Sequence, residues 1–135
     1  MRVWGIQQGC VLCAERDETR DHLFFACPYS FTVWDKLVNR LTGNGTDPDW
    51  MGTLRHVSDN SLPLFDRILL KMAFQTCVYL LWKERNGRRH HTCLRTVYQL
   101  IRIIDKTVRN RITSLRYKAG HKLEGLMRRW FEVTA

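Results

Sequence analysis

The stretch LPLFDRILLKMAFQTCVYLLWKERN, residues 62–86, sets the fold class of this chain of 135 residues. Its apolar side chains recur at steps of three and four, the spacing of one helix face. They are Phe65, Ile68, Leu69, Met72, Ala73, Thr76, Tyr79, Leu80 and Trp82. Ser61 is placed to cap this helix, Pro63 is tolerated in its first turn, and Gly87 is placed to end it. The stretch therefore predicts a long helix that buries most of one side.

Three further segments show helical spacing. The first covers residues 29–41, with Ser30 as the expected N-cap and Gly43 as the stop. The second covers residues 92–117, and its apolar residues form a seam suited to packing on a partner helix. They are Leu94, Val97, Ile101, Ile104, Val108 and Leu115. A shorter amphipathic segment has Leu123, Leu126, Met127, Trp130 and Phe131 on one face. Together these segments predict a bundle of about four helices.

Metal-ligand residue types gather in the first 28 residues. Cys10 and Cys13 form a CxxC turn, His22 follows after eight residues, and Cys27 after four more. Three cysteines and one histidine complete a tetrahedral zinc site with no open position for a catalytic water. Pro28 disfavours the helical conformation at Cys27, so a helical turn carrying His22 is expected to end there. The alternative is three unrelated buried cysteines and a surface histidine.

Three segments together resemble a known family. They are the pair Trp4–Gly5, the run CVLCAERDETRDHLFFACPYSFTVW of residues 10–34, and LLWKERNGRR of residues 80–89. They look like the reverse-transcriptase zinc-binding domain at the C-terminus of polyproteins of plant LINE-class non-LTR retrotransposons. The resemblance implies one structural zinc, Zn2+, held by Cys10, Cys13, His22 and Cys27. Family members have a further apolar segment before the Trp–Gly pair, so the resemblance implies an N-terminally truncated domain.

The expected fold class is therefore mainly α, a small Cys3His zinc knuckle followed by a bundle of about four helices. Residues 1–42 are expected to hold the knuckle and the first helix. Residues 43–61 are rich in turn-forming residues and predict a loop. Residues 62–135 form the basic helical region, and one compact domain is expected overall.

Charge is unevenly distributed along the chain. Residues 1–66 hold 6 Lys and Arg against 9 Asp and Glu, whereas residues 67–135 hold 16 against 4. The net charge of the second part is therefore +12, and that of the whole chain is +9. A basic surface of this kind attracts polyanions. RNA or single-stranded DNA is the expected partner, with an anionic membrane or an acidic protein as alternatives.

A stripe of arginines is the expected contact surface. Arg95, Arg102, Arg109 and Arg116 recur every seven residues, which keeps them on one side of a helix. Arg88 and Arg89 lie at the approach to this helix. The alternative is a solvated helix face that binds nothing. Trp4, beside the knuckle, is expected to stack on an unpaired base, whereas the other tryptophans are expected in the core.

The two remaining cysteines predict neither a second metal site nor a reactive thiol. His90, His91 and Cys93 form a cluster, but adjacent helical histidines diverge and no fourth ligand is visible. Cys77 lies in the apolar helix and is expected to be a small buried side chain.

The function expected from the sequence is a non-catalytic zinc-binding module that binds RNA or single-stranded DNA non-specifically. An enzyme is not expected, because the zinc site is closed and no adjacent Asp–Asp pair is present to hold two polymerase metals. The alternative is a protein-interaction or dimerisation module that uses the helical seam. With no signal peptide and no spanning apolar run, the expected location is the nucleus or cytoplasm.

Overall fold

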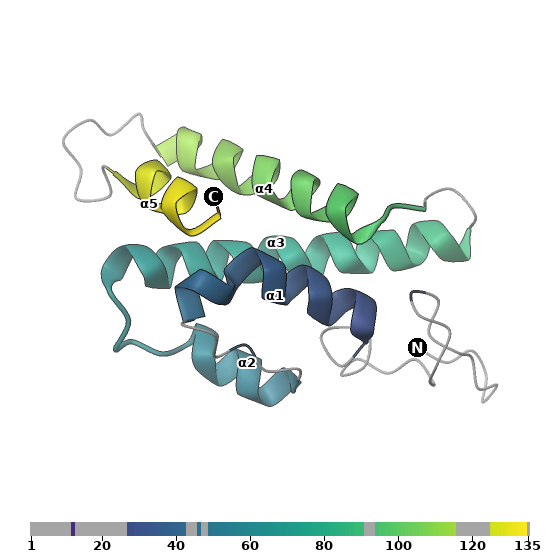
Figure 1. The fold of residues 1–135 in the computed structure, drawn as a ribbon, viewed down its shortest axis with the longest axis horizontal. Coiled ribbons are helices and arrows are strands. Elements are labelled where there is room, and N and C mark those ends of the chain that lie inside the picture. The colour runs from purple at the N-terminus through teal and green to yellow at the C-terminus, as the bar shows by residue number, and fades with distance from the viewer. Residues whose placement is uncertain are drawn as a thin grey trace.

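The computed structural model describes residue 12, residues 27–42, residue 46, and residues 49–90, 94–115 and 125–134. These residues form five α-helices and no strand (Figure 1). The helices are α1 (Pro28–Thr42), α2 (Trp50–Val57), α3 (Leu64–Arg89), α4 (Val97–Ser114) and α5 (Leu126–Thr134). The mainly α fold is confirmed, while the zinc knuckle lies almost entirely outside the described residues. No described helix combines the length and the apolar character needed to span a bilayer.

The long helix α3 is the centre of the bundle. It contacts α1, α2, α4 and α5, and α1 and α4 also contact α5 and each other. Figure 1 shows α4 running along one side of α3 and α1 along another, with α5 between α4 and the other helices. Both acidic residues of α3, Asp66 and Glu84, are buried.

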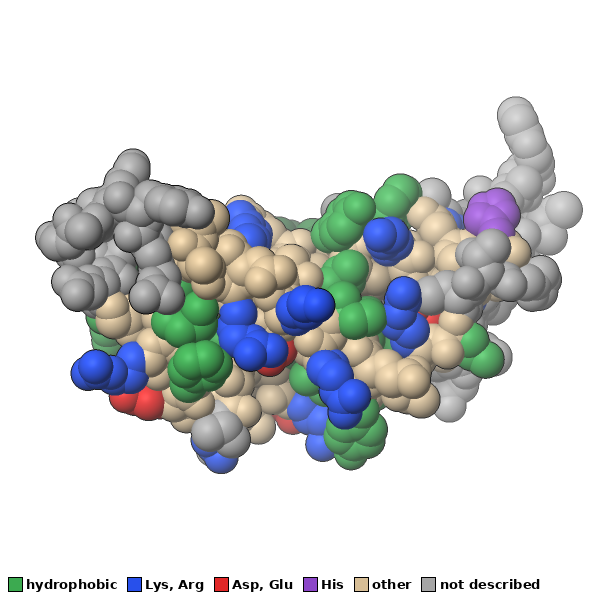
Figure 2. All heavy atoms as spheres, turned by 90° about the horizontal axis from the view of Figure 1, so that it is seen from above, with side chains coloured by type: hydrophobic (Ala, Val, Ile, Leu, Met, Phe, Trp, Pro, Cys, Tyr) green, Lys and Arg blue, Asp and Glu red, His purple; other side chains and the backbone are tan. Residues whose placement is uncertain are grey.

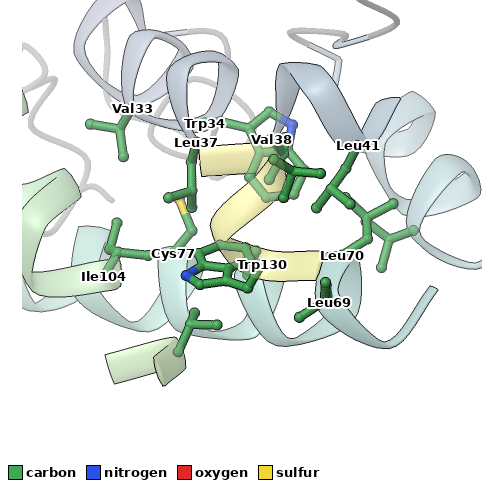
Figure 3. Packing of buried hydrophobic residues seen from close by; sticks show 14 of the residues in the cluster. Val33, Trp34, Leu37, Val38, Leu41, Leu69, Leu70, Cys77, Ile104 and Trp130 are labelled. Atoms are coloured by element: carbon green, nitrogen blue, oxygen red, sulfur yellow. The ribbon is translucent and has the colours of Figure 1, made fainter. Parts of the chain in front are cut away.

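The core is formed where four helices meet (Figure 3). Trp130 of α5 is fully buried and lies among side chains from α1, α3 and α4. The labelled neighbours are Val33, Trp34, Leu37, Val38, Leu41, Leu69, Leu70, Cys77 and Ile104. Cys77 is fully buried as expected, and burial raises the pKa of its thiol because the thiolate would lose its hydration. The Trp130 indole donates a hydrogen bond of 2.7 Å to Asp105, so its polar atom is satisfied.

Helix α5 is fixed to the start of α3 by a two-bond ion pair. Arg129 donates from Nε to Oδ1 of Asp66 at 2.7 Å and from Nη2 to Oδ2 at 3.1 Å. The hydrogen bond to Asp66 raises the pKa of Arg129. Gly125 precedes α5 with a φ of 93°, and a Cβ there would lie 3.6 Å from the Phe65 ring. A glycine suits this start because a left-handed conformation strains any other residue.

The expected loop at residues 43–61 is wrong in its centre, which forms α2. Asp49 caps this helix by accepting the Gly52 amide at 2.8 Å. Trp50 then packs its ring 5.7 Å from that of Phe74 on α3. The glycine and the turn-forming residues on either side favoured a loop in the sequence. The helix nevertheless forms, because its packing on α3 rather than its helix propensity stabilises so short a segment.

Several expected helix ends are also wrong. Helix α1 begins at Pro28, and Ser30 is buried inside it instead of capping it. Helix α3 continues through Gly87 to Arg89, and no side chain caps its start. Helix α4 begins only after Thr96, whose side chain forms a capping box with Gln99. The capping box satisfies two backbone amides reciprocally, which fixes the start of α4 after Arg95.

Two adjacent aromatic residues on α5 provide a test of the core. Trp130 is fully buried, whereas Phe131 is 50% exposed. We expect Trp130→Ala to lower the free energy of unfolding by about 3–5 kcal/mol, because it opens a large cavity. The matched change Phe131→Ala should cost less than about 1 kcal/mol, because its ring is half in water. Urea unfolding followed by circular dichroism measures both, and equal losses would contradict this position for α5.

Candidate metal centre and candidate nucleic-acid interface

The expected zinc ligands lie at the edge of the described region. Cys27 is fully buried, and its carbonyl accepts the Phe31 amide at 2.8 Å, so it leads directly into α1. Cys10, Cys13 and His22 lie outside the described residues. Within the described ranges no group of three His, Cys, Asp or Glu residues is placed to hold a metal, but these ranges include only one of the four expected ligands.

Two described residues that lie close to expected ligands in the sequence contact one guanidinium. Leu12 lies between Cys10 and Cys13 and is buried against the bundle. Its carbonyl accepts a hydrogen bond of 3.4 Å from Nη1 of Arg88. Tyr29 follows Cys27 by two residues, and the same guanidinium lies 4.7 Å from the centre of its ring. Leu12 and Tyr29 are therefore close in space, because both contact the Arg88 guanidinium.

Arg88 belongs to a cluster around the buried Glu84 that also includes Arg95 and Tyr29, here called the Glu84 cluster. Glu84 is fully buried, and its Oε2 accepts from Nε of Arg88 at 2.7 Å and from the Arg95 amide at 2.9 Å. The Arg95 carbonyl accepts from Arg88 Nη2 at 2.6 Å and from the Tyr29 hydroxyl at 2.8 Å. The cluster thus joins the end of α3, the residue before the α4 cap, and the start of α1.

Two of the arginines expected to contact nucleic acid have internal roles. The Arg88 side chain is only 13% exposed, and three of its nitrogen atoms donate within the protein. Arg95 is 43% exposed, and its guanidinium lies 3.5 Å from Glu84. Arg95 also precedes α4, so the expected stripe of four arginines on one helix is wrong at this position. Trp4 and Arg116 lie outside the described residues.

The middle of α4 retains exposed positive charge. Arg102 and Lys106 are exposed and make no ion pair with any residue of the described ranges. Arg109 is 42% exposed and forms an ion pair of 3.1 Å with Asp105, whose other oxygen accepts from Trp130. Arg89, at the end of α3, is half-buried. Figure 2 shows Lys and Arg side chains spread over the face that includes α4, with few acidic side chains between them.

Two aromatic residues expected in the core lie on the surface. Tyr79 and Trp82 are 56% and 45% exposed. They follow the fully buried Cys77 by two and five residues, which places them about 160° and 140° around the helix from it. The sequence did contain this signal, because the narrower stripe of Ala73, Cys77, Leu81 and Glu84 marks the buried side. This narrow stripe was hard to recognise in the sequence, because it includes Glu84, a charged residue.

The seam expected to bind another protein is largely used within the chain. Ile104 and Val108 are fully buried in the core, and Val97 and Ile101 pack against it. Leu94 and Leu115, at the two ends of the seam, are 81% and 37% exposed. The central part of the seam is therefore not available to a partner.

The Glu84 cluster can be tested by a double-mutant cycle. Arg88→Met should lower the free energy of unfolding by about 3–5 kcal/mol, because a buried carboxylate loses its main partner. Adding Glu84→Leu should restore part of that loss, because the unpaired charge is then removed. Urea unfolding measures each variant, with Lys83→Met as an exposed control on the same helix. A double variant as unstable as the sum of the single variants would contradict the pairing.

Comparison with known proteins addresses the ligand run directly. Residues 1–34 match the family model described as zinc-binding in reverse transcriptase. No curated protein and no solved structure matches the chain. The match contains all four expected ligands, although it extends only into α1 and leaves the bundle unassigned. The resemblance to this family is thus confirmed over residues 1–34, which are similar to it in sequence.

Proposed function

We propose that the chain is a non-catalytic zinc-binding module that binds RNA or single-stranded DNA with little sequence preference. The observation that carries this proposal is the internal use of acidic side chains in α3 and α4. Asp66 pairs with Arg129, Glu84 with Arg88 and Arg95, and Asp105 with Arg109 and Trp130. Arg102 and Lys106 on α4 thus have no ion-pair partner among the described residues, and exposed cations of this kind are typical of surfaces that bind phosphate backbones.

The zinc assignment is part of the same proposal. Cys10, Cys13, His22 and Cys27 would hold one zinc ion, whose role is to stabilise the fold of the N-terminal residues. Support comes from the family match over residues 1–34 and from the contact of both Leu12 and Tyr29 with Arg88. A plant LINE-class element is the proposed origin, and the nucleus or cytoplasm the proposed place of action.

The competing role, a protein-interaction or dimerisation module, has less support. It would use the α4 seam, whose central residues are buried within this chain. A concentration-dependent dimer without binding to nucleic acid would favour that role. Catalysis is not proposed, because the zinc-binding family does not supply the catalytic part of reverse transcriptase and a four-ligand zinc leaves no open position.

One zinc per chain is the first expected result. Elemental analysis of purified protein should give a zinc to protein ratio of about one, because structural zinc is held by about 10 kcal/mol or more. Cys10→Ser with Cys13→Ser should remove the zinc. Cys93→Ser is the matched control outside the ligand run and should retain it. Equal zinc content in the first variant and the control would show that the ligands are misassigned.

The salt dependence of binding tests the basic surface of α4. Arg102→Gln with Lys106→Gln should weaken binding to a single strand and lower the slope of log affinity against log salt by about 1.4, or about 0.7 for each lost phosphate contact. Glutamine preserves helix propensity, so the fold should be unchanged. Fluorescence anisotropy with a labelled oligonucleotide measures this slope.

A variant with the same loss of charge elsewhere provides the control. Arg40 and Arg55 are exposed on α1 and α2, so Arg40→Gln with Arg55→Gln should change the slope much less. Equal effects of the two pairs would indicate a diffuse attraction to net charge rather than contacts along α4.

A further inference from the structure

The side of α3 turned away from the core has an unusual composition. It exposes Tyr79 and Trp82, whereas Trp34 and Trp130 are 2% and 0% exposed. These two rings lie three residues apart on the helix, so their side chains are neighbours on one face. An exposed pair of large rings is a feature of binding surfaces.

The charges around these rings are positive. Lys83 lies with its Nζ 5.9 Å from the centre of the Tyr79 ring, and Lys71 is exposed two turns earlier on the same side. From α4, Arg111 reaches across to Gln75 on this side at 3.3 Å. Both acidic residues of α3 are buried on the opposite side, so this exposed face of the helix has no carboxylate. We name this surface, formed by Lys71, Gln75, Tyr79, Trp82, Lys83 and Arg111, the outer α3 face.

Aromatic rings beside cations match the chemistry of an unpaired nucleic-acid strand. Every base has a flat face that stacks on tyrosine or tryptophan, and each phosphate attracts lysine or arginine. In a duplex the base faces are already stacked on one another, so they are not free to stack on the two rings. Only the attraction between the phosphates and the lysine or arginine side chains then remains. An acidic protein segment would use the cations but would not require the rings to be aromatic.

We propose that the outer α3 face binds single-stranded RNA or DNA by stacking unpaired bases on Tyr79 and Trp82. Phosphates of the same strand lie beside Lys71, Lys83 and Arg111. This assignment rests on the proposed nucleic-acid function and gives it a preference for unpaired over paired strands. The face is continuous with the basic surface of α4 through the contact of Arg111 with Gln75.

The experiment separates stacking from plain apolar contact. Tyr79→Leu with Trp82→Leu keeps apolar side chains of good helix propensity but removes both rings. Tyr79→Phe with Trp82→Phe keeps an aromatic ring at each position. Phe131→Leu is the matched control, because Phe131 is an exposed ring on α5. Each protein is titrated with a labelled oligo(U) strand and with a duplex of equal length, and circular dichroism checks the fold.

The leucine pair should lower affinity for the single strand by about 10- to 100-fold, while affinity for the duplex changes less than about threefold. The phenylalanine pair should retain most of the single-strand affinity, and Phe131→Leu should match the original protein. Unchanged single-strand affinity in the leucine pair would overturn the assignment but leave the proposed function in place. Equal losses for both strands would also overturn it.

Two other results would contradict this assignment in different ways. An original protein that binds no single strand at low salt would overturn both this assignment and the proposed function. A concentration-dependent dimer in the original protein that dissociates in both ring variants, with single-strand affinity unchanged, would assign the outer α3 face to contact between two copies. Sedimentation velocity measures that state.

Discussion

Glu84 is a carboxylate with no exposed surface, at a helix position where the surrounding pattern is apolar. A buried charge of this kind is tolerated only with close partners, because removing it from water costs several kcal/mol. The partners come from two other places in the chain, the Arg88 guanidinium one turn later and the amide of Arg95. By satisfying Glu84, the chain also fixes Arg95, just before α4, against the end of α3 and brings Tyr29 against Arg88. One acidic residue thus constrains three segments.

The same requirement explains the surface charge of the bundle. The acidic residues of α3 and α4 all have partners within the bundle, so Asp66, Glu84 and Asp105 pair with Arg129, Arg88 and Arg109 rather than with Arg102 or Lys106. Net charge alone would not have established this, because 13 acidic residues are present in the chain. Their placement, and not only their number, makes the exposed face positive. This is why the outer α3 face and the α4 surface have the charge that a phosphate backbone requires.

Periodicity in the sequence was sufficient to predict α1, α3, α4 and α5, because each buries a long apolar stripe. It failed for α2, whose stability comes from the contact of Trp50 with Phe74, two residues far apart in the sequence. The expected helix end at Gly87 was also wrong. Glycine often ends a helix, but here the next residue, Arg88, is bound to Glu84 from within the helix. The expected ligand run depends on local spacing, so a single sequence was enough to predict it. The roles of Arg88 and Arg95 depend on tertiary pairing, and a pattern of spacing does not contain that information.

The contact between Leu12 and the bundle is unequal in the two directions. Arg88 also bonds to Glu84 and to the Arg95 carbonyl, and these bonds, at 2.7 and 2.6 Å, are the shorter ones. The bond to Leu12, at 3.4 Å, is the longest of the three. The bundle therefore loses little if the contact with Leu12 is broken, whereas Leu12 loses both its hydrogen bond and its packing against the core. The helical body is thus the support against which Leu12 packs, and the order of dependence runs from Glu84 through Arg88 to Leu12.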